Sequence, residues 1–451
     1  MKILFCCEFY APSVGGVQEV IRQLAERLAA RGHEVTVATT ALPARQFTEL
    51  RGVRIEEFTV SGNLVKGMQG ELNEYRQFVT TGSFDIVVIK AAQQWTFDAL
   101  WPVLQDVRGK KAFIPCGFSC LYEPDYAKYF EDLPRVLRQF DHLIFYASDY
   151  RDIAFAKQHG CSKWSIIPNG ASETEFNVLP DRSFRRRHGI DEHSLLFLTV
   201  GSPASMKGHY EIAEAFLEAE FSGRPATLVL NAGSSIGHVR SVSGAPVVQL
   251  KVYEYVRALG EVYERDGLWA AVTHMCHGLL NKAGIRAGRY AVLDKSQPPA
   301  FQDVLTDLIR RIHKQHAGKR VVLTDLPRPD LIQAYIEADL FLFASRVEYS
   351  PLVLFESAAA GTPFLSVPVG NSPEIAEWTG AGVICPASRD ERGYTIVDAK
   401  VFGAQWSSLV SNMSHLKHLG KAGRRNWAAR FTWNAITDQY ESLFKKVALH
   451  A

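Results

Sequence analysis

Short runs of apolar residues alternate along the chain with longer segments in which apolar residues recur every three or four positions. The short runs predict strands that are buried on both faces, and the periodic segments predict amphipathic helices. Regular alternation of these two element types is typical of parallel α/β layers. The predicted strands lie at residues 3–7, 35–38, 86–89, 112–114, 143–146 and 165–167, and then at 195–200, 227–230, 321–324, 340–343 and 364–366.

The predicted strands form two sets, separated by a charged segment at residues 181–188. A chain of 451 residues also exceeds the size at which a single hydrophobic core stops growing. We therefore expect two Rossmann-like sheets joined near residue 180. Residues 236–296 are too many for a simple connection inside such a unit and include aromatic-rich helical stretches. We interpret them as a helical insertion in the second half of the chain.

Each set of strands opens with a strand that is followed by a glycine-containing loop. Gly15 and Gly16 follow the first of these strands, and the loop from Gly201 to Gly208, with Lys207, follows the second. Ligands of open parallel sheets bind beyond the carboxyl ends of the strands, so both loops are expected to face one cleft. The glycine pair would let the backbone approach a phosphate, although a plain tight turn explains it equally well. Lys207 fits either an anion site or a solvated loop.

The segment Arg346-Val-Glu-Tyr-Ser-Pro-Leu-Val-Leu-Phe-Glu356 follows a predicted strand and leads into a predicted helix. Ser350 is suited to the N-cap position and Pro351 to the first helical position. Gly361 is suited to the position just after the helix. The helix is therefore expected over residues 351–360.

This segment contains two carboxylates, Glu348 and Glu356, which lie eight positions apart around the start of the helix. Glu348 is expected in the loop at the carboxyl end of the strand, whereas Glu356 falls on the apolar stripe of the helix and needs a partner there. Such a pair could grip a polar ligand. An acidic residue near a helix N-terminus can also serve only to stabilise the helix dipole, by about 0.3–1 kcal/mol, and that interpretation explains the segment as well.

Composition narrows the possible functions. Fifty basic and forty-eight acidic residues leave a net charge of +2, which gives no electrostatic case for binding nucleic acid. Seven cysteines without a C-x-x-C motif argue against a disulfide framework and favour a reducing cytoplasm. The N-terminal apolar run is interrupted by Glu8 and is too short for a signal peptide, and no apolar run approaches the ~18 residues of a membrane span. Peripheral attachment to the inner face of a membrane, through the basic run at 310–320, stays open.

No metal site and no cofactor are expected. The chain contains no D-x-D pair, the usual device for holding a divalent cation on a diphosphate. His274, Cys276 and His277 lie close together in the sequence, but no second ligand cluster with a familiar spacing accompanies them.

Several segments, in their order along the chain, resemble the motifs of the family-4 retaining glycosyltransferases of the GT-B fold. The pair of glutamates resembles the Glu-x7-Glu motif of that family. The other matching segments are Lys2 to Phe5, Pro12 to Gly16, Gly32 to Val37, Ile167 to Gly170 with Phe176, Val200-Gly201 with Lys207-Gly208, Gly361 to Pro363, Gly370 to Glu374, and Phe431 to Trp433 with the closing helix. The resemblance covers nearly the whole chain apart from residues 236–296.

The resemblance implies a role for each matching residue. Glu348 would contact the transferred sugar, Lys207 would balance the charge of the leaving diphosphate, and both are expected to be catalytic. Glu356 would hold the ribose hydroxyls of the nucleotide. The expected donor-binding residues are Gly15, Gly16, Gly201, Ser202, Lys207, Tyr349, Ser350, Leu352, Val353 and Glu356, and the expected acceptor-side residues are Cys116 and Gly117.

The implied architecture is GT-B, with two Rossmann-like domains facing an interdomain cleft. Residues 1–178 would form the acceptor domain, with the closing helix at 432–451 packed back on it, and residues 179–431 the nucleotide-sugar donor domain. The implied enzyme is metal-independent and retaining, and uses a front-face route. It would transfer a sugar from a nucleotide sugar to a glycan, lipid-linked or small-molecule acceptor, in the synthesis of cell-surface polysaccharide or glycoconjugate.

Two positions depart from the family pattern and keep other functions open. Family members usually carry an arginine where this chain has Ser202, and commonly a histidine where it has Cys116. A catalytically silent protein that binds a sugar nucleotide or a glycan is therefore an alternative. A nucleotide-binding oxidoreductase is a further alternative, but no G-x-G-x-x-G follows a predicted strand. The donor base, the sugar, the acceptor and the oligomeric state are not predicted.

Overall fold

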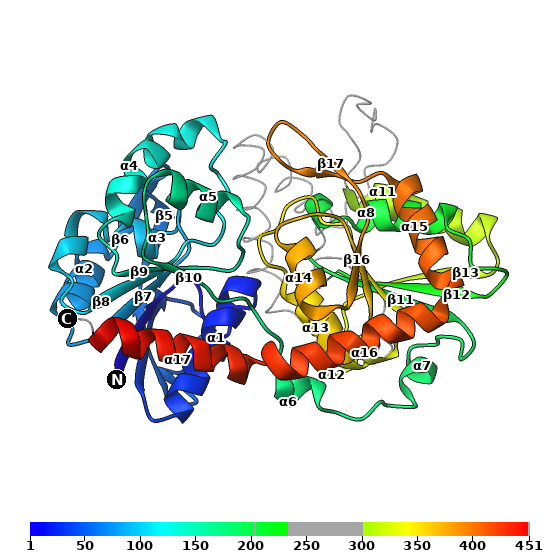
Figure 1. Ribbon diagram of the computed structural model, residues 1–451, viewed down its shortest axis with the longest axis horizontal. Helices are drawn as coiled ribbons and strands as arrows, with labels where there is room; N and C mark the ends of the chain where they lie inside the picture. The colour runs from blue at the N-terminus through cyan, green and yellow to red at the C-terminus, as the bar shows by residue number, and fades with distance from the viewer. Residues whose placement is uncertain (203, 233–300, 450–451) are drawn as a thin grey trace, which may run out of the picture.

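The computed structural model describes residues 1–451 except 203, 233–300 and 450–451. The described residues form two lobes, each built around a parallel sheet covered by helices (Figure 1). The insertion expected at 236–296, together with His274, Cys276 and His277, lies outside the described residues. In the part of the chain that is described, no helix combines the length and the apolarity needed to cross a bilayer.

The first lobe contains an eight-stranded sheet in the order β10-β9-β8-β7-β1-β2-β4-β3. All its neighbouring strands run parallel except β3 and β4. Its strands are β1 (Lys2–Cys6), β2 (Glu34–Thr40), β3 (Glu49–Leu50), β4 (Val53–Phe58), β7 (Ile86–Lys90), β8 (Lys110–Ile114), β9 (His142–Phe145) and β10 (Trp164–Ile166). A separate hairpin joins β5 (Val60–Asn63) and β6 (Gly67–Gly70).

Helices cover both faces of this sheet, because successive residues of each strand point to opposite sides. On β1, Ile3 and Phe5 belong to one core cluster and Leu4 and Cys6 to the other, and all four are fully buried. The helices of this half are α1 (Gly16–Ala30), α2 (Leu72–Thr81), α3 (Trp95–Asp98), α4 (Ala127–Leu137), α5 (Arg151–Gln158) and α6 (Glu173–Phe176).

The second lobe contains a six-stranded, fully parallel sheet in the order β13-β12-β11-β14-β15-β16. Its strands are β11 (Leu195–Val200), β12 (Ala226–Asn231), β13 (Lys319–Thr324), β14 (Leu340–Phe343), β15 (Phe364–Ser366) and β16 (Gly382–Ile384). Its helices are α7 (Phe184–Arg187), α8 (His209–Glu218), α11 (Phe301–Gln315), α12 (Arg328–Glu337), α13 (Leu352–Ala360), α14 (Ser372–Thr379), α15 (Ala399–Ser411) and α16 (Met413–Arg430). A hairpin of β17 (Ser388–Arg389) and β18 (Thr395–Ile396) follows the last sheet strand.

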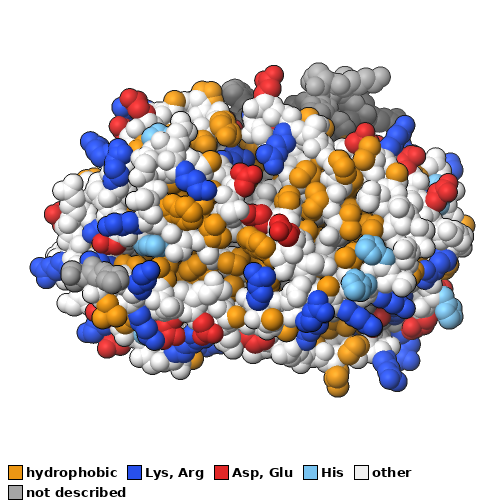
Figure 2. All heavy atoms as spheres, in the orientation of Figure 1, with side chains coloured by type: hydrophobic (Ala, Val, Ile, Leu, Met, Phe, Trp, Pro, Cys, Tyr) orange, Lys and Arg blue, Asp and Glu red, His pale blue; other side chains and the backbone are white. Residues whose placement is uncertain are grey.

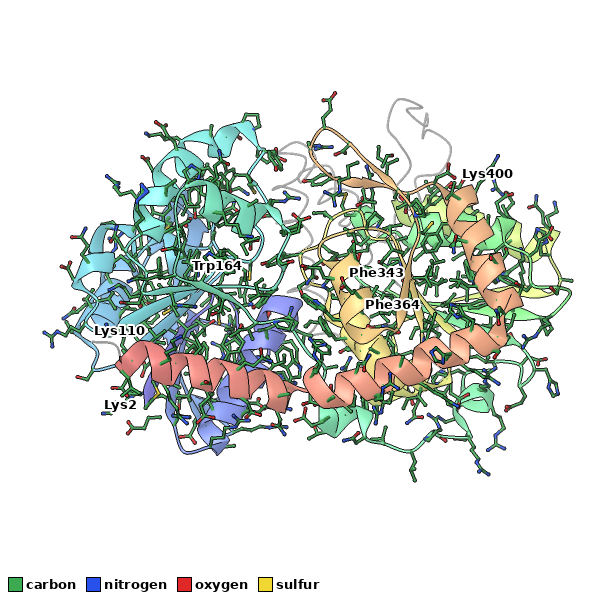
Figure 3. All side chains as sticks on the ribbon, in the orientation of Figure 1. Lys2, Lys110, Trp164, Phe343, Phe364 and Lys400 are labelled. Atoms are coloured by element: carbon green, nitrogen blue, oxygen red, sulfur yellow. The ribbon has the colours of Figure 1, made fainter. Side chains whose placement is uncertain are left out.

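The carboxyl ends of the first sheet's strands face the second lobe. Lys2 and Lys110, the first residues of β1 and β8, lie at the outer side of the first lobe (Figure 3). Phe343, at the end of β14, lies in the inner half of the second lobe in the same view. Loops that follow strands of the two sheets therefore meet between the lobes, where open parallel sheets bind their ligands.

The closing helix, α17 (Trp433–Leu449), leaves the second lobe and packs on α1 of the first (Figure 1). Its Phe444 ring lies 6.4 Å from the ring of Phe5, between centroids. Arg31 of α1 donates to Glu441 of α17 at 2.8 Å. The chain thus ends against the lobe in which it began, although the exact domain boundaries at 178 and 431 stay a prediction.

Two local expectations were wrong. Helix α13 begins at Leu352, one residue later than expected, and Pro351 with φ −69° and ψ 117° is its extended N-cap. Ser350 is therefore not the cap, and its buried hydroxyl has no partner among the described residues.

The charged segment at 181–188 is also not a simple linker. It contains α7, and Arg185 pairs with Glu337 of α12 at 3.0 Å. In the space-filling view, acidic and basic side chains are interspersed over the face shown (Figure 2).

Gly208 is a position at which the fold requires glycine. Its φ is +76°, and a Cβ added there would lie 2.1 Å from the carbonyl oxygen of Ala344. We expect Gly208→Ala to lower the free energy of unfolding by about 2–5 kcal/mol, the sum of a left-handed backbone cost of about 1–2 kcal/mol and a clash of about 1–3 kcal/mol. Urea denaturation at 25 °C measures the loss.

Gly189 provides the matched control for this substitution. Its φ is +59°, but a Cβ there would meet only the Arg320 guanidinium, at 3.8 Å. Gly189→Ala should therefore cost only the backbone term of about 1–2 kcal/mol. Equal losses in the two variants would show that the contact with Ala344 costs nothing.

Candidate functional site

The two lobes meet at Tyr349, which leaves the loop after β14 and enters the first lobe. The backbone N–H of Tyr146 donates to the Tyr349 hydroxyl at 2.9 Å. The Tyr349 ring packs against the rings of Tyr146 and Tyr150, with centroids 5.4 and 4.7 Å away. Tyr150 returns a hydrogen bond, since its hydroxyl donates to the carbonyl of Glu348 at 2.7 Å. This set of interactions is called the Tyr349 contact below.

Further hydrogen bonds hold the same loops together across the lobes. The Asn371 side chain donates to the carbonyl of Tyr146 at 2.9 Å. The backbone N–H of Ser148 donates to the Glu374 carboxylate at 2.9 Å. The Asn169 side chain donates to the carbonyl of Ser350 at 3.1 Å. The loop carrying Glu348 is consequently fixed relative to both sheets.

Lys207 and Glu348, both predicted from the sequence, are brought together by the structure. The Lys207 ammonium lies 2.5 Å from the Glu348 carboxylate, and both side chains are partly exposed. Lys207 ends the short helical turn at 205–207 that follows β11, and Gly208 is the N-cap of α8. A cation and a carboxylate from two different loops thus face the same space.

Glu356 has a partner that the sequence did not reveal. Arg328, the first residue of α12, donates to Glu356 at 2.5 Å and to Glu175 of α6 at 2.8 Å. Burial alone would lower the pKa of Arg328, but the two carboxylates raise it well above its usual value. No local pattern marks Arg328, because its role depends on two residues that lie 28 and 153 positions away in the sequence.

Cys116 and Gly117 lie beneath the Tyr349 ring. Cys116, Gly117 and Phe118 all have left-handed backbone angles, with φ of 60°, 89° and 49°. A Cβ on Gly117 would meet the Tyr349 and Tyr150 rings at 3.0 Å. Cys116 and Phe118, which are not glycines, each store strain of about 1–3 kcal/mol in this conformation, and such residues cluster at functional sites.

Lys90 and Asp152 form the buried floor of this region, and the sequence did not point to either. Lys90 donates to the Tyr146 hydroxyl, and burial lowers the pKa of Lys90. Burial likewise raises the pKa of Cys116. Asp152 accepts from the backbone N–H of Gly117 at 2.9 Å and from that of Ile153 at 2.8 Å. Burial raises the pKa of Asp152 to about 6, although these donors and Tyr349 oppose the shift.

The remaining predicted residues lie at the edges of this arrangement. Gly15 caps α1 in an extended conformation, and Gly16 is the first residue of that helix. Leu352 and Val353 open α13. Gly201 and Ser202 follow β11, and the ring of buried His209 lies 3.3 Å from the Gly201 carbonyl oxygen. Within the described ranges, no hydrogen bond joins Gly15, Gly16 or Ser202 to Lys207 or to either glutamate.

Among the residues that the structure describes, no three His, Cys, Asp or Glu side chains gather in a way that could hold a metal ion.

Two family profiles match the chain. The profile of Glycosyltransferase Family 4 matches residues 14–174, and that of Glycosyl transferases group 1 matches residues 298–396. The first match contains Gly15, Gly16, Cys116 and Gly117, and the second contains both glutamates.

Curated relatives agree with these families. The chain is 20% identical over 446 residues to the N-acetyl-alpha-D-glucosaminyl L-malate synthase of Bacillus anthracis, covering 97% of this chain and 95% of that protein. Shorter matches link it to the D-inositol 3-phosphate glycosyltransferase of Segniliparus rotundus (31% over 112 residues) and to spore coat protein SA of Bacillus subtilis (25% over 150 residues). These two matches cover 25% and 32% of this chain, and only 23% and 37% of the two relatives.

Solved structures establish the fold. Sucrose-phosphate synthase from Thermosynechococcus elongatus superimposes with a TM-score of 0.66 at 17% identity, covering all of both chains. HepE from Anabaena, in complex with UDP and glucose, superimposes with a TM-score of 0.62 at 14% identity, covering 99% of this chain and 100% of that one. The expectation of a GT-B fold is confirmed.

The raised pKa of Asp152 predicts a specific pH dependence of stability. Well below pH 4 the carboxyl is protonated in both folded and unfolded chains, and well above pH 6 it is ionised in both. Between these values the folded chain binds more protons, so the free energy of unfolding falls as the pH rises, by about 3 kcal/mol in total for a shift of about two units. Asp152→Asn cannot titrate and removes this contribution.

Urea denaturation of both proteins at pH 4, 5, 6 and 7 measures the effect. The wild-type free energy of unfolding minus that of Asp152→Asn should fall from pH 4 to pH 7, with most of the loss between pH 4 and pH 6. Asp98, whose pKa burial also raises to about 6, titrates in both proteins and cancels in the difference. A difference that rises with pH would mean that the folded pKa of Asp152 is lowered.

Proposed function

The chain belongs to the group 1 glycosyltransferases of family 4, enzymes that use nucleotide sugars, and we propose that it is a retaining member that works without a metal ion. The Lys207–Glu348 pair is the observation that carries this proposal. It supplies a fixed positive charge and a fixed carboxylate at the carboxyl ends of the second sheet. Those are the two charges that transfer of a sugar from a diphosphate demands.

The two charges act on opposite partners in the transition state. As the bond between the sugar C1 and the phosphate breaks, negative charge develops on the leaving diphosphate and positive charge on the sugar ring. Lys207 stabilises the first, and Glu348 stabilises the second. Because they already lie 2.5 Å apart, both groups are oriented before the donor arrives, and little reorganisation accompanies the reaction.

Glu356 holds the ribose of the nucleotide in this proposal. Its carboxylate is oriented by Arg328 at 2.5 Å, and its side chain is 14% exposed. A carboxylate has about four lone-pair positions, so the contact with Arg328 leaves acceptor capacity for two ribose hydroxyls. Arg328 is thus a positioning residue for Glu356, and Glu175 holds Arg328 from the other side.

Metal independence is supported by the primary sequence, which contains no D-x-D pair. The charge of the diphosphate is balanced instead by Lys207 and by the backbone N–H groups at the start of α8, a helix of ten residues. Helix N-termini and a lysine ammonium are sufficient to hold phosphate at many anion sites.

The acceptor side is proposed at Cys116 and Gly117, next to the Tyr349 contact. Relatives with acid or phosphate groups in their names, the L-malate synthase and the inositol 3-phosphate glycosyltransferase, favour a small acceptor. A structural neighbour, the glycosyltransferase WaaG, is involved in lipopolysaccharide biosynthesis. For the present chain, the corresponding role is synthesis of a cell-surface glycan at the inner face of the membrane.

A catalytically silent binding protein is the second candidate. The Tyr349 ring, which packs over Gly117 between the lobes, is the observation that favours it. Release of nucleoside diphosphate across a panel of nucleotide sugars separates the two functions, because a silent protein binds the donor without turnover.

Glu348→Gln and Glu356→Gln should differ in kind. Glu356→Gln removes the charge that pairs with Arg328 and accepts from the ribose, so it should raise the donor KM and weaken binding of the bare nucleoside diphosphate about tenfold or more. Glu348→Gln should leave that binding nearly unchanged and lower kcat about 100-fold, because its contact strengthens only as charge develops on the sugar. Calorimetry with nucleoside diphosphate and steady-state kinetics provide the two readouts.

Glu377→Gln is the matched control, since Glu377 lies in α14 and forms no ion pair with any described residue. The control should change neither quantity. If Glu348→Gln abolishes nucleoside diphosphate binding while Glu356→Gln leaves it intact, the roles of the two carboxylates are reversed.

Transfer should survive chelation. We expect the rate in 5–10 mM EDTA, roughly the excess needed to strip weakly held Mg²⁺ or Mn²⁺, to stay within about twofold of the untreated rate, because Lys207 performs the charge balance that a metal would otherwise supply. Loss of transfer on chelation, restored by added Mg²⁺ or Mn²⁺, would place a metal ion in the reaction.

A further inference from the structure

A pocket opens beside Glu348, between the two lobes. The first lobe contributes Tyr122, Asp149 and Arg151 to its wall, and the second contributes Arg346, Glu348 and Arg389. Arg389 belongs to β17, which lies on the side of the second lobe that faces the first (Figure 1). Because Glu348 lines this pocket, a ligand inside it lies next to the proposed point of sugar transfer.

The three arginines of this pocket carry charge that no carboxylate neutralises by contact. Arg151 donates to the carbonyl of Ser119 at 3.3 Å, and Arg389 donates to the carbonyl of Pro368 at 3.3 Å. Neither these two nor Arg346 forms an ion pair with any residue that the structure describes. Arg328, by contrast, is held in two such pairs.

The balance of charge around the pocket is positive. Three arginines and Lys207 face two carboxylates, Asp149 and Glu348, which leaves an excess of two positive charges. Glu211 also acts on Arg346, and counting it still leaves one positive charge in excess. Unpaired guanidinium groups in a concave site are suited to the planar oxygens of phosphate and carboxylate.

The pocket also has the size and the aromatic surface for a sugar-like molecule. Its cavity volume is about 200 Å³, which is smaller than a drug-sized site and limits the ligand to a small molecule. The Arg151 guanidinium lies over the rings of Tyr122 and Tyr150, at 5.4 and 5.3 Å from their centroids, which limits its freedom. Tyr122 is 58% exposed and offers the apolar face of its ring to a ligand.

We propose that this pocket binds the acceptor, and that the acceptor is a small soluble polyol or sugar carrying a phosphate or carboxylate group. The anionic group lies on Arg151, Arg346 and Arg389, and an acceptor hydroxyl points toward Glu348. The inference rests on the proposed function, because it identifies the second substrate of the same reaction.

The test uses the full chain and three probes: D-glucose 6-phosphate, D-glucuronate and uncharged D-glucose. Each is titrated by calorimetry into protein saturated with the best-binding nucleoside diphosphate, so that the probes cannot occupy the donor phosphate site. The two anionic probes should bind at least tenfold more tightly than D-glucose. Arg151→Gln and Arg389→Gln should each weaken anionic binding at least tenfold and leave the Kd for the nucleoside diphosphate unchanged.

Arg392→Gln is the control, because Arg392 lies in the same hairpin loop as Arg389 but packs on Tyr394 and does not line the pocket. It should bind all probes as the wild type does. Equal binding of charged and uncharged probes, or arginine variants that bind like the control, would overturn the proposal. The proposal would also be overturned if the protein bound none of the three probes but bound vesicles containing phosphatidic acid, and if that binding depended on the arginines. The arginines would then recognise a lipid headgroup.

The two proposals fail in different ways. If no nucleoside diphosphate binds, the proposed function fails, and the arginine variants still test the anion site with D-glucose 6-phosphate alone. If nucleoside diphosphate binds but the probes do not distinguish the variants, the pocket assignment fails and the proposed function stands.

Discussion

The Tyr349 contact joins the lobe that carries the proposed reacting groups to the first lobe. Tyr349 lies between Glu348 and Ser350, and its hydroxyl and ring are held by Tyr146 and Tyr150 of the other lobe. The position of Glu348 relative to the first sheet therefore depends on how deeply Tyr349 enters that lobe. Tyr150 also donates to the backbone carbonyl of Glu348 at 2.7 Å. Separation of the lobes would therefore break the Tyr349 contact and move the Glu348 carboxylate away from the first lobe.

Each of the two glutamates of the site is paired with its own cation. Lys207 contacts Glu348 and Arg328 contacts Glu356, at 2.5 Å in both cases. A partly buried charge without a partner carries a desolvation cost, which such a contact offsets. The two cations come from different elements, Arg328 from α12 and Lys207 from the turn after β11. The two carboxylates are therefore drawn toward different parts of the cleft.

The sequence predicted the elements whose signals are local. All the predicted strands are present, because each is marked by a short, mostly apolar run. β4 was missed because Arg54, Glu56 and Glu57 interrupt such a run, and β16 because it has only three residues, including Gly382. The sequence predicted that Lys207 and Glu348 each lie in a loop after a strand, but it did not predict the ion pair between them. Arg328, Lys90 and Asp152 could not be predicted, since their roles arise from contacts between distant segments.

The distribution of arginines explains how the departures from the family pattern can be compatible with activity. Ser202 leaves Lys207 as the side-chain cation of the phosphate loop, so the charge near the leaving group is smaller than in relatives with an arginine there. The excess positive charge lies instead beside Glu348, on Arg151, Arg346 and Arg389. An anionic acceptor bound there would neutralise this excess before transfer. The positive charge of the nearby arginines opposes formation of the oxocarbenium ion on the sugar ring, and a bound anion would remove this effect. Lys207 would still stabilise the negative charge of the leaving diphosphate. Binding of the acceptor would thereby favour the chemical step, and a donor bound without an acceptor would be protected from hydrolysis.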